Sequence, residues 1–253
     1  MSTVRGVRER ARIEVTAAIK DEARKQLAAE GAAKLSLRAV ARELGMASSA
    51  LYRYFPSRDE LLTALIVDAY DAIGESAEAA HRAARAEAAP HLARWTAVAR
   101  AVRAWALTHP HEYALIYGSP VPGYTAPQKT TGPAARVGFV LISVVDDAYR
   151  EDGLAVPSLS RELRAESERM AAEFAPGLPP GAAVPLIAAW SQLFGLISFE
   201  VFGQFNRVVE ARDQFFLAAV TDLARGVGLL GPRDVDRARF PGQSPGASRS
   251  STG

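Results

Sequence analysis

Residues 35–62 read LSLRAVARELGMASSALYRYFPSRDELL. Apolar residues recur at the i, i+3, i+4 and i+7 positions of a short helix, 37–43, which Ser36 can cap. Gly45 then accepts the positive φ angle that a tight turn requires, and a second short helix, 48–54, follows before Pro56. Two short helices joined by such a turn are typical of the helix-turn-helix unit that binds DNA, here spanning residues 36–55.

The second of these helices has the composition of a recognition helix. Its first residues are small, which lets a helix N-terminus enter the major groove of DNA. Leu51 and Phe55 are four residues apart and are expected to face inward. The side chains that would then point toward DNA are Ser48, Ser49, Tyr52 and Arg53.

Charge is distributed unevenly along the 253 residues. The first 60 residues contain 12 Lys or Arg and 8 Asp or Glu, whereas the remainder contains 18 and 20. A basic end on a slightly acidic body is expected when only one end of a protein meets a polyanion, although a solvated basic face gives the same pattern.

Helical periodicity continues through the chain, and no segment alternates with a period of two. The predicted fold class is therefore all-α. We expect a flexible basic arm at 1–9, a helix-turn-helix domain at 10–57, a helical body at 58–230 and a disordered tail at 231–253. The helices expected along the chain are 10–30, 37–43, 48–54, 58–86, 90–110, 111–117, 134–150, 159–174, 183–206 and 210–227. A Gly/Pro-rich loop is expected at 118–133.

Composition excludes several chemistries. The chain has no cysteine, and it contains no GxSxG, P-loop or GxGxxG motif, so we expect neither an enzyme nor a bound cofactor. Of the four histidines, only His109 and His111 are clustered, and Pro110 separates them without a third ligand at useful spacing, so no metal site is expected. Residues 1–30 lack the apolar run of a signal peptide, which favours the cytoplasm.

Residues 177–199 carry no charge and approach the length of a membrane span. Three prolines and the polar Ser191 and Gln192 interrupt the segment, so we interpret it as a helix buried between protein partners and expect no membrane insertion. Broad apolar stripes on helices 183–206 and 210–227 predict pairing with the same helices of a second chain. The residues expected in this homodimer interface are Ile197, Val201, Phe205, Phe216, Val220 and Leu223.

Residues 35–62 resemble the DNA-binding region of the TetR/AcrR family of bacterial regulators. The matching features are Ser36, Val40-Ala41, Gly45, Leu51-Tyr52, Tyr54-Phe55, Ser57-Arg58 and Leu61-Leu62. Ala47 stands where the family usually has Ser or Thr, and Ser49 stands where Gly is frequent. The resemblance covers about residues 10–70, and HPHEYALIYGSPVPGY at 109–124 resembles a C-terminal domain subtype of such regulators.

The resemblance implies roles for individual residues. Ser36, Tyr52, Tyr54 and Arg58 would contact DNA phosphates, and Arg53 would contact a base edge, with guanine as the best partner. The tyrosines could instead pack in a core, and the arginines could be solvated. The full set of DNA-binding residues expected is Ser36, Arg38, Ala47, Ser48, Ser49, Tyr52, Arg53, Tyr54 and Arg58.

The resemblance also implies a small-molecule pocket in the helical body. A small apolar or aromatic effector is expected there, although the same aromatic residues could simply form a core. The residues expected to bind it are Trp105, Tyr113, Tyr117, Phe139, Trp190 and Phe194. The chain would then be a ligand-responsive repressor that binds a palindromic operator as a homodimer. The alternatives are a helical small-molecule carrier with an incidental basic N-terminus, and a helical enzyme that uses the aromatic body as its pocket.

Overall fold

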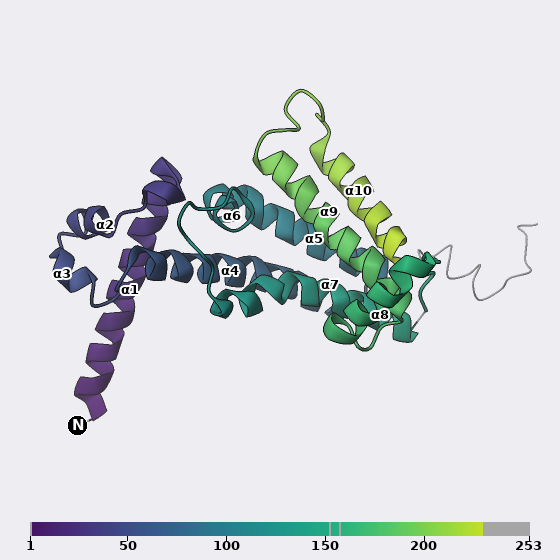
Figure 1. Cartoon of the computed structure of the whole chain (residues 1–253), viewed down its shortest axis with the longest axis horizontal. Helices are drawn as coiled ribbons and strands as arrows, with labels where there is room; N and C mark the ends of the chain where they lie inside the picture. Colours follow the sequence, from purple (N-terminus) through teal and green to yellow (C-terminus); the bar gives the residue numbers. More distant parts are fainter. Residues whose placement is uncertain (1, 152, 157, 230–253) are drawn as a thin grey trace, which may run out of the picture. The chain divides into compact units, whose positions relative to one another are not determined.

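A computed structural model describes residues 2–151, 153–156 and 158–229. Every regular element in these ranges is a helix (Figure 1), which confirms the all-α class. The expected disordered tail at 231–253 lies outside the described residues. The α-helices are α1 (Ser2–Glu30), α2 (Leu37–Glu43), α3 (Ser48–Leu51), α4 (Arg58–Ala86), α5 (His91–Thr108), α6 (Pro110–Tyr117), α7 (Thr131–Glu151), α8 (Arg161–Phe174), α9 (Ala183–Val201) and α10 (Arg212–Val227). Three 3-10 helices are η1 (Ala32–Lys34), η2 (Gln128–Thr130) and η3 (Pro180–Ala182).

The chain divides into two compact units. Of the described residues, the first unit comprises those up to Glu78, Ala101–Val137 and Ile197–Asn206, and the second comprises Ala79–Arg100, those between Gly138 and Leu196, and those from Arg207 to Leu229. This division differs from the expected boundary between residues 57 and 58. The reason is that the beginning of α4 supplies buried leucines to the helix-turn-helix core.

The N-terminal segment also differs from expectation. In place of a flexible arm at 1–9, α1 begins at Ser2 and runs without interruption to Glu30. Within its first turns, Nε of Arg10 donates to the carbonyl of Gly6 at 3.3 Å. The segment contains no proline, so the backbone hydrogen bonds of the helix can continue toward the N-terminus. As expected, α1 ends before Gly31, whose φ is 79°.

The core of the helix-turn-helix region is built by α1, α2, α3 and the first turns of α4. Its buried apolar side chains come from each of these helices and exclude water from their common centre. Leu51 and Phe55 lie in this core, as the sequence predicts. The core residues are Ile19, Ala23, Leu27, Leu35, Leu37, Val40, Ala41, Leu51, Phe55, Leu61, Leu62 and Leu65.

The turn between α2 and α3 is a Schellman motif, which ends a helix with a residue of positive φ. Gly45 has a φ of 62°, its N–H donates to the carbonyl of Arg42 at 3.1 Å, and Met46 N–H donates to Ala41 at 2.8 Å. The α-helical part of α3 is shorter than expected and ends at Leu51. The chain then makes one tighter turn through Tyr54, whose N–H donates to Leu51 at 2.8 Å.

Serine side chains cap α2, as expected, and α4. Oγ of Ser36 accepts from Ala39 N–H at 3.4 Å, and Oγ of Ser57 accepts from Glu60 N–H at 3.1 Å. Each cap satisfies a backbone donor that the first turn of a helix leaves without a partner. The Glu60 carboxylate accepts a hydrogen bond from Nζ of Lys129 at 2.9 Å.

The second unit packs around Trp95, which is fully buried and donates from Nε1 to the carbonyl of Val220 at 3.1 Å. Leu141, Val144 and Leu193 are also buried in this unit. In the first unit, α9 ends earlier than the expected residue 206. Gly203 has a φ of 83°, a conformation that favours glycine and interrupts the helical path.

Candidate nucleic-acid interface

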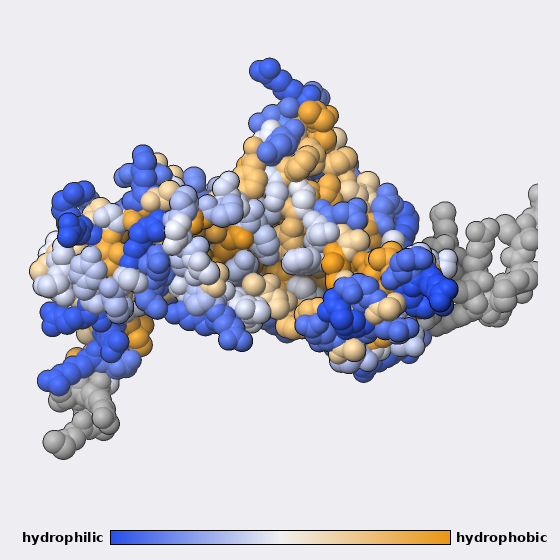
Figure 2. Space-filling model, in the orientation of Figure 1, coloured by the Kyte–Doolittle hydropathy of each residue, from blue (hydrophilic) through white to orange (hydrophobic). Residues whose placement is uncertain are grey.

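The exposed face of α2 and α3 carries most of the side chains expected to contact DNA. Ser48, Ser49, Tyr52 and Arg53 are exposed around α3, and Arg38 is exposed on α2. The surface over these two helices is hydrophilic to neutral in Figure 2. Because Leu51 holds the opposite side of α3 in the core, the exposed side keeps one fixed orientation on the unit.

Two cations on this face have no acidic partner within the part of the chain that the structure describes. Among the described residues, neither Arg38 nor Arg53 forms an ion pair, whereas the neighbouring Arg42 contacts Glu43 at 3.3 Å. An exposed guanidinium without a carboxylate partner can pair with a phosphate or a guanine edge without first breaking an internal contact. This face is therefore electrostatically suited to a polyanion.

Arg58 is placed differently from expectation. Its Nε donates to the carbonyl of Leu35 at 3.1 Å, and its Nη2 donates to Ala32 at 2.8 Å and to Ala33 at 3.2 Å. Its Nη1 lies 3.7 Å from the carboxylate of Asp59. The guanidinium thus joins the start of α4 to the segment before α2, and a phosphate would have to compete with these contacts.

The remaining expected DNA-binding residues have mixed surroundings. Ser36 is half-buried at the start of α2, where its hydroxyl accepts the capping hydrogen bond. Tyr54 is half-buried and packs against the helix-turn-helix core, which favours the packing alternative for its ring. Ala47 is exposed and begins α3 without a side-chain cap.

The six aromatic residues expected to bind an effector fall into two groups. Trp105, Tyr113 and Tyr117 lie in the first unit, and Phe139, Trp190 and Phe194 lie in the second. The Tyr113 and Tyr117 rings are 5.1 Å apart, and the Trp190 and Phe194 rings are 5.7 Å apart. Tyr113 is fully buried, whereas Phe139 is 54% exposed.

Three of the residues expected in the dimer interface are buried inside the single chain: Ile197, Phe216 and Val220. They are therefore unavailable to a second chain in this conformation. Val201, Phe205 and Leu223 are half-buried. Helical periodicity alone identified apolar stripes, but it did not show which side of each stripe the chain itself covers.

The first unit also contains a groove that sequence reasoning did not assemble. It has a volume of about 810 Å³ and is lined by residues 27, 31–33, 111, 114, 115, 117–122, 202 and 204. We call it the α6 groove, because much of α6 and the loop after it form one wall. Only Tyr117 among the expected effector-binding residues lines it. The sequence signals for this region were the irregular Gly/Pro-rich segment beginning at Gly118 and the resemblance of residues 109–124 to a C-terminal domain subtype.

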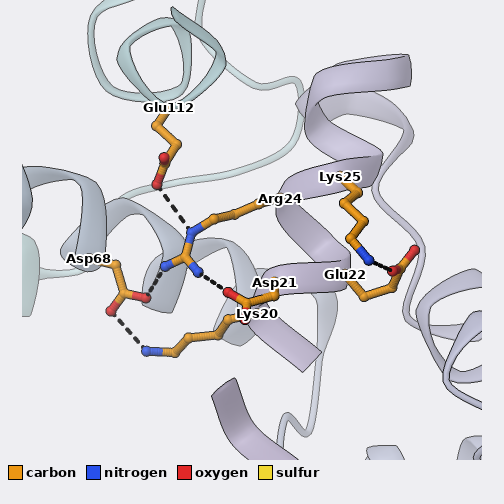
Figure 3. A network of polar contacts seen from close by, with 7 residues as sticks. All are labelled: Lys20, Asp21, Glu22, Arg24, Lys25, Asp68 and Glu112. Carbon is orange, nitrogen blue, oxygen red and sulfur yellow. Dashed lines mark hydrogen bonds and ion pairs between the residues drawn. The ribbon is translucent and has the colours of Figure 1, made fainter. Parts of the chain in front are cut away.

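An ion-pair network that joins α6 to α1 and α4 was also not predicted. Arg24 on α1 donates to Asp21 at 2.7 Å, to Asp68 on α4 at 2.7 Å and to Glu112 on α6 at 3.1 Å (Figure 3). Lys20 binds the other oxygen of Asp68 at 2.8 Å. One guanidinium therefore links three helices that are distant in sequence, a relationship that no local spacing reveals.

The helix-turn-helix geometry and its exposed cations define a DNA-binding regulator. Residues 19–65 match the family described as bacterial regulatory proteins, tetR family, and residues 95–223 match the tetracyclin repressor-like C-terminal domain. The chain belongs to the TetR family of transcriptional regulators.

Individual relatives agree with this assignment. The HTH-type transcriptional regulator Rv1816 of Mycobacterium tuberculosis is 42% identical over 214 residues, which cover 79% of this chain and 86% of the relative. The regulator Mb1846 of Mycobacterium bovis has the same identity and coverage. The crystal structure of the protein SCO4313 is 38% identical with a TM-score of 0.71, covering 85% of this chain and 97% of that one. The TetR family regulator PfmR of Thermus thermophilus shares the fold, with 18% identity, a TM-score of 0.53 and coverage of 84% and 99%.

Proposed function

We propose that this regulator binds a palindromic operator as a homodimer, represses transcription, and is released by a small apolar or aromatic effector. The relatives are bacterial transcriptional regulators, and the compartment that fits this function is the cytoplasm, where bacterial DNA lies. The single observation that carries the proposal is the exposed face of α2 and α3 with its unpaired Arg38 and Arg53.

Contacts from this face divide into two kinds. In this proposal Arg38 and Tyr52 bind backbone phosphates, which position a protein on DNA without reading its sequence. Arg53 reads a base in this proposal, since a guanidinium can donate two hydrogen bonds to guanine in the major groove. Binding should therefore combine a steep dependence on salt concentration with a preference for one sequence.

The apolar surface of α9 and α10 supports a dimer. The segment Pro180–Val201 is long and apolar enough to cross a membrane, with an 18-residue window whose mean hydropathy is 1.6, yet only 39% of that window is buried inside the chain. Ile187, Trp190, Phe215 and Leu217 are exposed in the second unit, and Figure 2 shows apolar surface over α9 and α10. Covering this surface with its copy in a second chain would remove the four side chains from water.

A dimer also suits the proposed operator. Two recognition helices reading the two halves of a palindrome must enter successive major grooves about 34–36 Å apart. An effector would release DNA only if it bound more tightly to a conformation in which this spacing is wrong. An effector that bound both conformations with equal affinity would leave DNA binding unchanged.

The proposal is tested by selecting bound duplexes from a random pool with the full-length protein, followed by footprinting. We expect a palindrome protected on both half-sites. A matched pair of variants, Arg53→Ala in the motif and Arg100→Ala on the exposed surface of α5, shows whether binding uses this face. A selection that yields no enriched sequence, with equal binding by both variants, would contradict the proposal.

A small-molecule carrier is the second candidate, and the volume of the α6 groove is the observation that favours it. A carrier and a regulator differ in one measurable respect. If cells that carry the doubly substituted Arg38→Ala/Arg53→Ala protein have the same phenotype as cells that carry the wild type, the DNA face is incidental. If they have the phenotype of cells that lack the protein, the regulator is supported.

A further inference from the structure

The N-terminal part of α1 projects from the helix-turn-helix core. Val15 is the first described residue of α1 that packs against this core, and the side chains at 7–14 are all exposed. Figure 1 shows this part of α1 extending past α2 and α3. We call residues 6–14 the α1 extension. At 1.5 Å per residue it carries the helix about 13 Å beyond the core, over about two and a half turns.

The apolar side chains of the α1 extension do not form a continuous face. Its large apolar residues are Val7 and Ile13, and both are exposed. They are six residues apart, which at 3.6 residues per turn places them about 120° apart around the helix. A helix that docks on a protein or a lipid surface has apolar residues three and four apart, which form one stripe. The α1 extension therefore lacks the apolar stripe that such a partner requires.

Arginines give the α1 extension its chemical character. Its charged residues are Arg8, Glu9, Arg10, Arg12 and Glu14. Among the described residues, neither Arg8 nor Arg12 forms an ion pair, whereas Nε of Arg10 donates to the carbonyl of Gly6 at 3.3 Å. Arg8 and Arg12 are four residues apart, so they share one side of the helix about 6 Å apart along its axis, and Arg10 lies on the other side. Two neighbouring guanidiniums without a carboxylate partner suit a row of phosphates.

The arginine side of α1 faces the segment that follows the recognition helix. In the first unit, Arg12 and Thr16 of α1 line a groove whose other walls include Tyr54 and Phe55. Tyr54 comes two residues after Tyr52, which is exposed beside α3. DNA that is bound on the exposed side of α3 would therefore pass close to this groove. The α1 extension continues from the groove away from the core, and it would meet the duplex beyond the base pairs that α3 contacts.

The helical form of the α1 extension limits which part of the duplex it can contact. A helix with its side chains is about 10–12 Å across, whereas the minor groove of B-DNA is about 6 Å wide. The α1 extension therefore cannot enter the minor groove as an extended basic arm would. In the proposed function, α3 occupies the major groove of the half-site. The sugar-phosphate backbone beside the half-site is the surface that remains.

We propose that the α1 extension is a second DNA contact, in which Arg8 and Arg12 bind backbone phosphates outside the half-site that α3 reads. This inference rests on the proposed function and extends it to the DNA that flanks the operator. At a rise of about 3.4 Å per base pair, the length of the α1 extension corresponds to about four base pairs on each side. Contacts of this kind add affinity and salt dependence without adding a sequence preference.

The contact is tested by measuring the affinity of the full-length protein for a selected duplex at several salt concentrations. Arg8→Ala and Arg12→Ala should each make the plot of log DNA affinity against log salt concentration shallower by about one unit per bound protomer. The double variant should bind about 10-fold more weakly or worse at about 0.1 M salt. Alanine is the strongest helix former, so these variants keep the helix.

Arg10→Ala is the matched control, because it removes the same type of side chain from the other side of the same helix. Its affinity and salt dependence should match the wild type. Wild-type behaviour of both Arg8→Ala and Arg12→Ala would overturn the proposal. An equal loss in Arg10→Ala would also overturn it, because the effect would then follow net charge and not one side of α1.

The length of the duplex locates the contact. Removing the four base pairs outside each half-site should weaken wild-type binding about as much as the double substitution does, and should not weaken the double variant further. Exchanging A·T for G·C pairs in these flanks should leave binding unchanged, since phosphates carry no sequence information. A preference for A·T flanks that disappears in the double variant would overturn the phosphate contact in favour of the minor groove.

Failure of this inference is distinguishable from failure of the proposed function. If Arg53→Ala weakens operator binding, while the α1 variants and the shortened duplex behave like the wild type and the full duplex, the proposed function stands and the α1 contact is overturned. If the protein binds no duplex, both are overturned.

Discussion

Nε of Arg58 donates to the carbonyl oxygen of Leu35 at 3.1 Å, across 23 residues of sequence. This contact and those to Ala32 and Ala33 fasten the chain before α2 to the first turn of α4. The guanidinium is therefore engaged within the helix-turn-helix unit, whereas its position in the motif suggested a phosphate contact.

Arg58→Ala should lower the free energy of unfolding by about 1–3 kcal/mol, because several carbonyl groups lose a charged donor at once. Urea denaturation measures this loss, and Arg42→Ala is the control on the neighbouring surface. At temperatures where the variant remains folded, the dependence of DNA binding on salt should match the wild type. If the plot of log DNA affinity against log salt concentration instead has a slope about one unit shallower in the variant than in the wild type, Arg58 contacts a phosphate.

Arg53→Ala should weaken binding to the selected operator by about 1–3 kcal/mol and relax the preference at one base pair. Arg38→Ala should weaken binding to all duplexes similarly, because a phosphate contact carries no sequence information. Fluorescence anisotropy on the operator and on single-base variants separates the two effects. Equal loss on every sequence for both variants would show that Arg53 does not read a base.

Leu217→Glu should produce monomers if the exposed surface of α9 and α10 is the dimer interface. Leu163→Glu on α8 is the matched control, because the two leucines are 42% and 45% exposed. Sedimentation should show half the wild-type mass for Leu217→Glu alone. Operator affinity should fall by about 100-fold or more, because the two half-sites would be bound independently. Val220 is unsuitable for this test because it is fully buried in its own chain.

The second unit should lose stability as the pH falls through the range in which His81 is protonated in the unfolded chain. Burial lowers the pKa of His81 below its usual 6.5, with Arg85 and Arg94 acting in the same direction and Asp147 opposing them. Neither ring nitrogen has a hydrogen-bond partner among the described residues. Because the folded state binds the proton less readily than the unfolded state, its stability is greatest above pH 6.5 and declines below it.

Thermal unfolding between about pH 7.5 and about pH 5.5 measures this effect, and His81→Leu should flatten the curve. His111→Asn, a change at an exposed histidine, serves as the control. A wild-type curve that is parallel to that of His81→Leu over this range would contradict the assignment.

Removing one partner of the ion pair between Arg103 and Glu200 should lower the free energy of unfolding strongly, because the pair is buried. Nε and Nη2 of Arg103 donate to the two carboxylate oxygens at 2.6 and 2.7 Å, and the two side chains are 13% and 5% exposed. Arg103→Met should cost about 3–5 kcal/mol, because it leaves a buried carboxylate without this partner. The double variant Arg103→Met/Glu200→Leu should recover most of that loss. Equal destabilisation in the single and double variants would contradict this account.

Local sequence determined the helix-turn-helix motif, since its signals act within a few residues. Ser36 caps α2 through the N–H of Ala39, and Gly45 provides the positive φ of the turn. The spacing of Leu51 and Phe55 sets which side of the recognition helix is buried. These features depend on backbone geometry and helical periodicity, which are readable without knowing what packs against them.

Tertiary packing decided what the distant residues do. The carbonyls that bind Arg58, the acidic partners of Arg24 and the burial of Val220 all arise from contacts across tens of residues. An apolar stripe predicts that a face will be covered, but whether the same chain or a second chain covers it depends on how the helices pack. The groove beside α6 has the same origin, because its walls come from three separated segments and exist only after the first unit has folded.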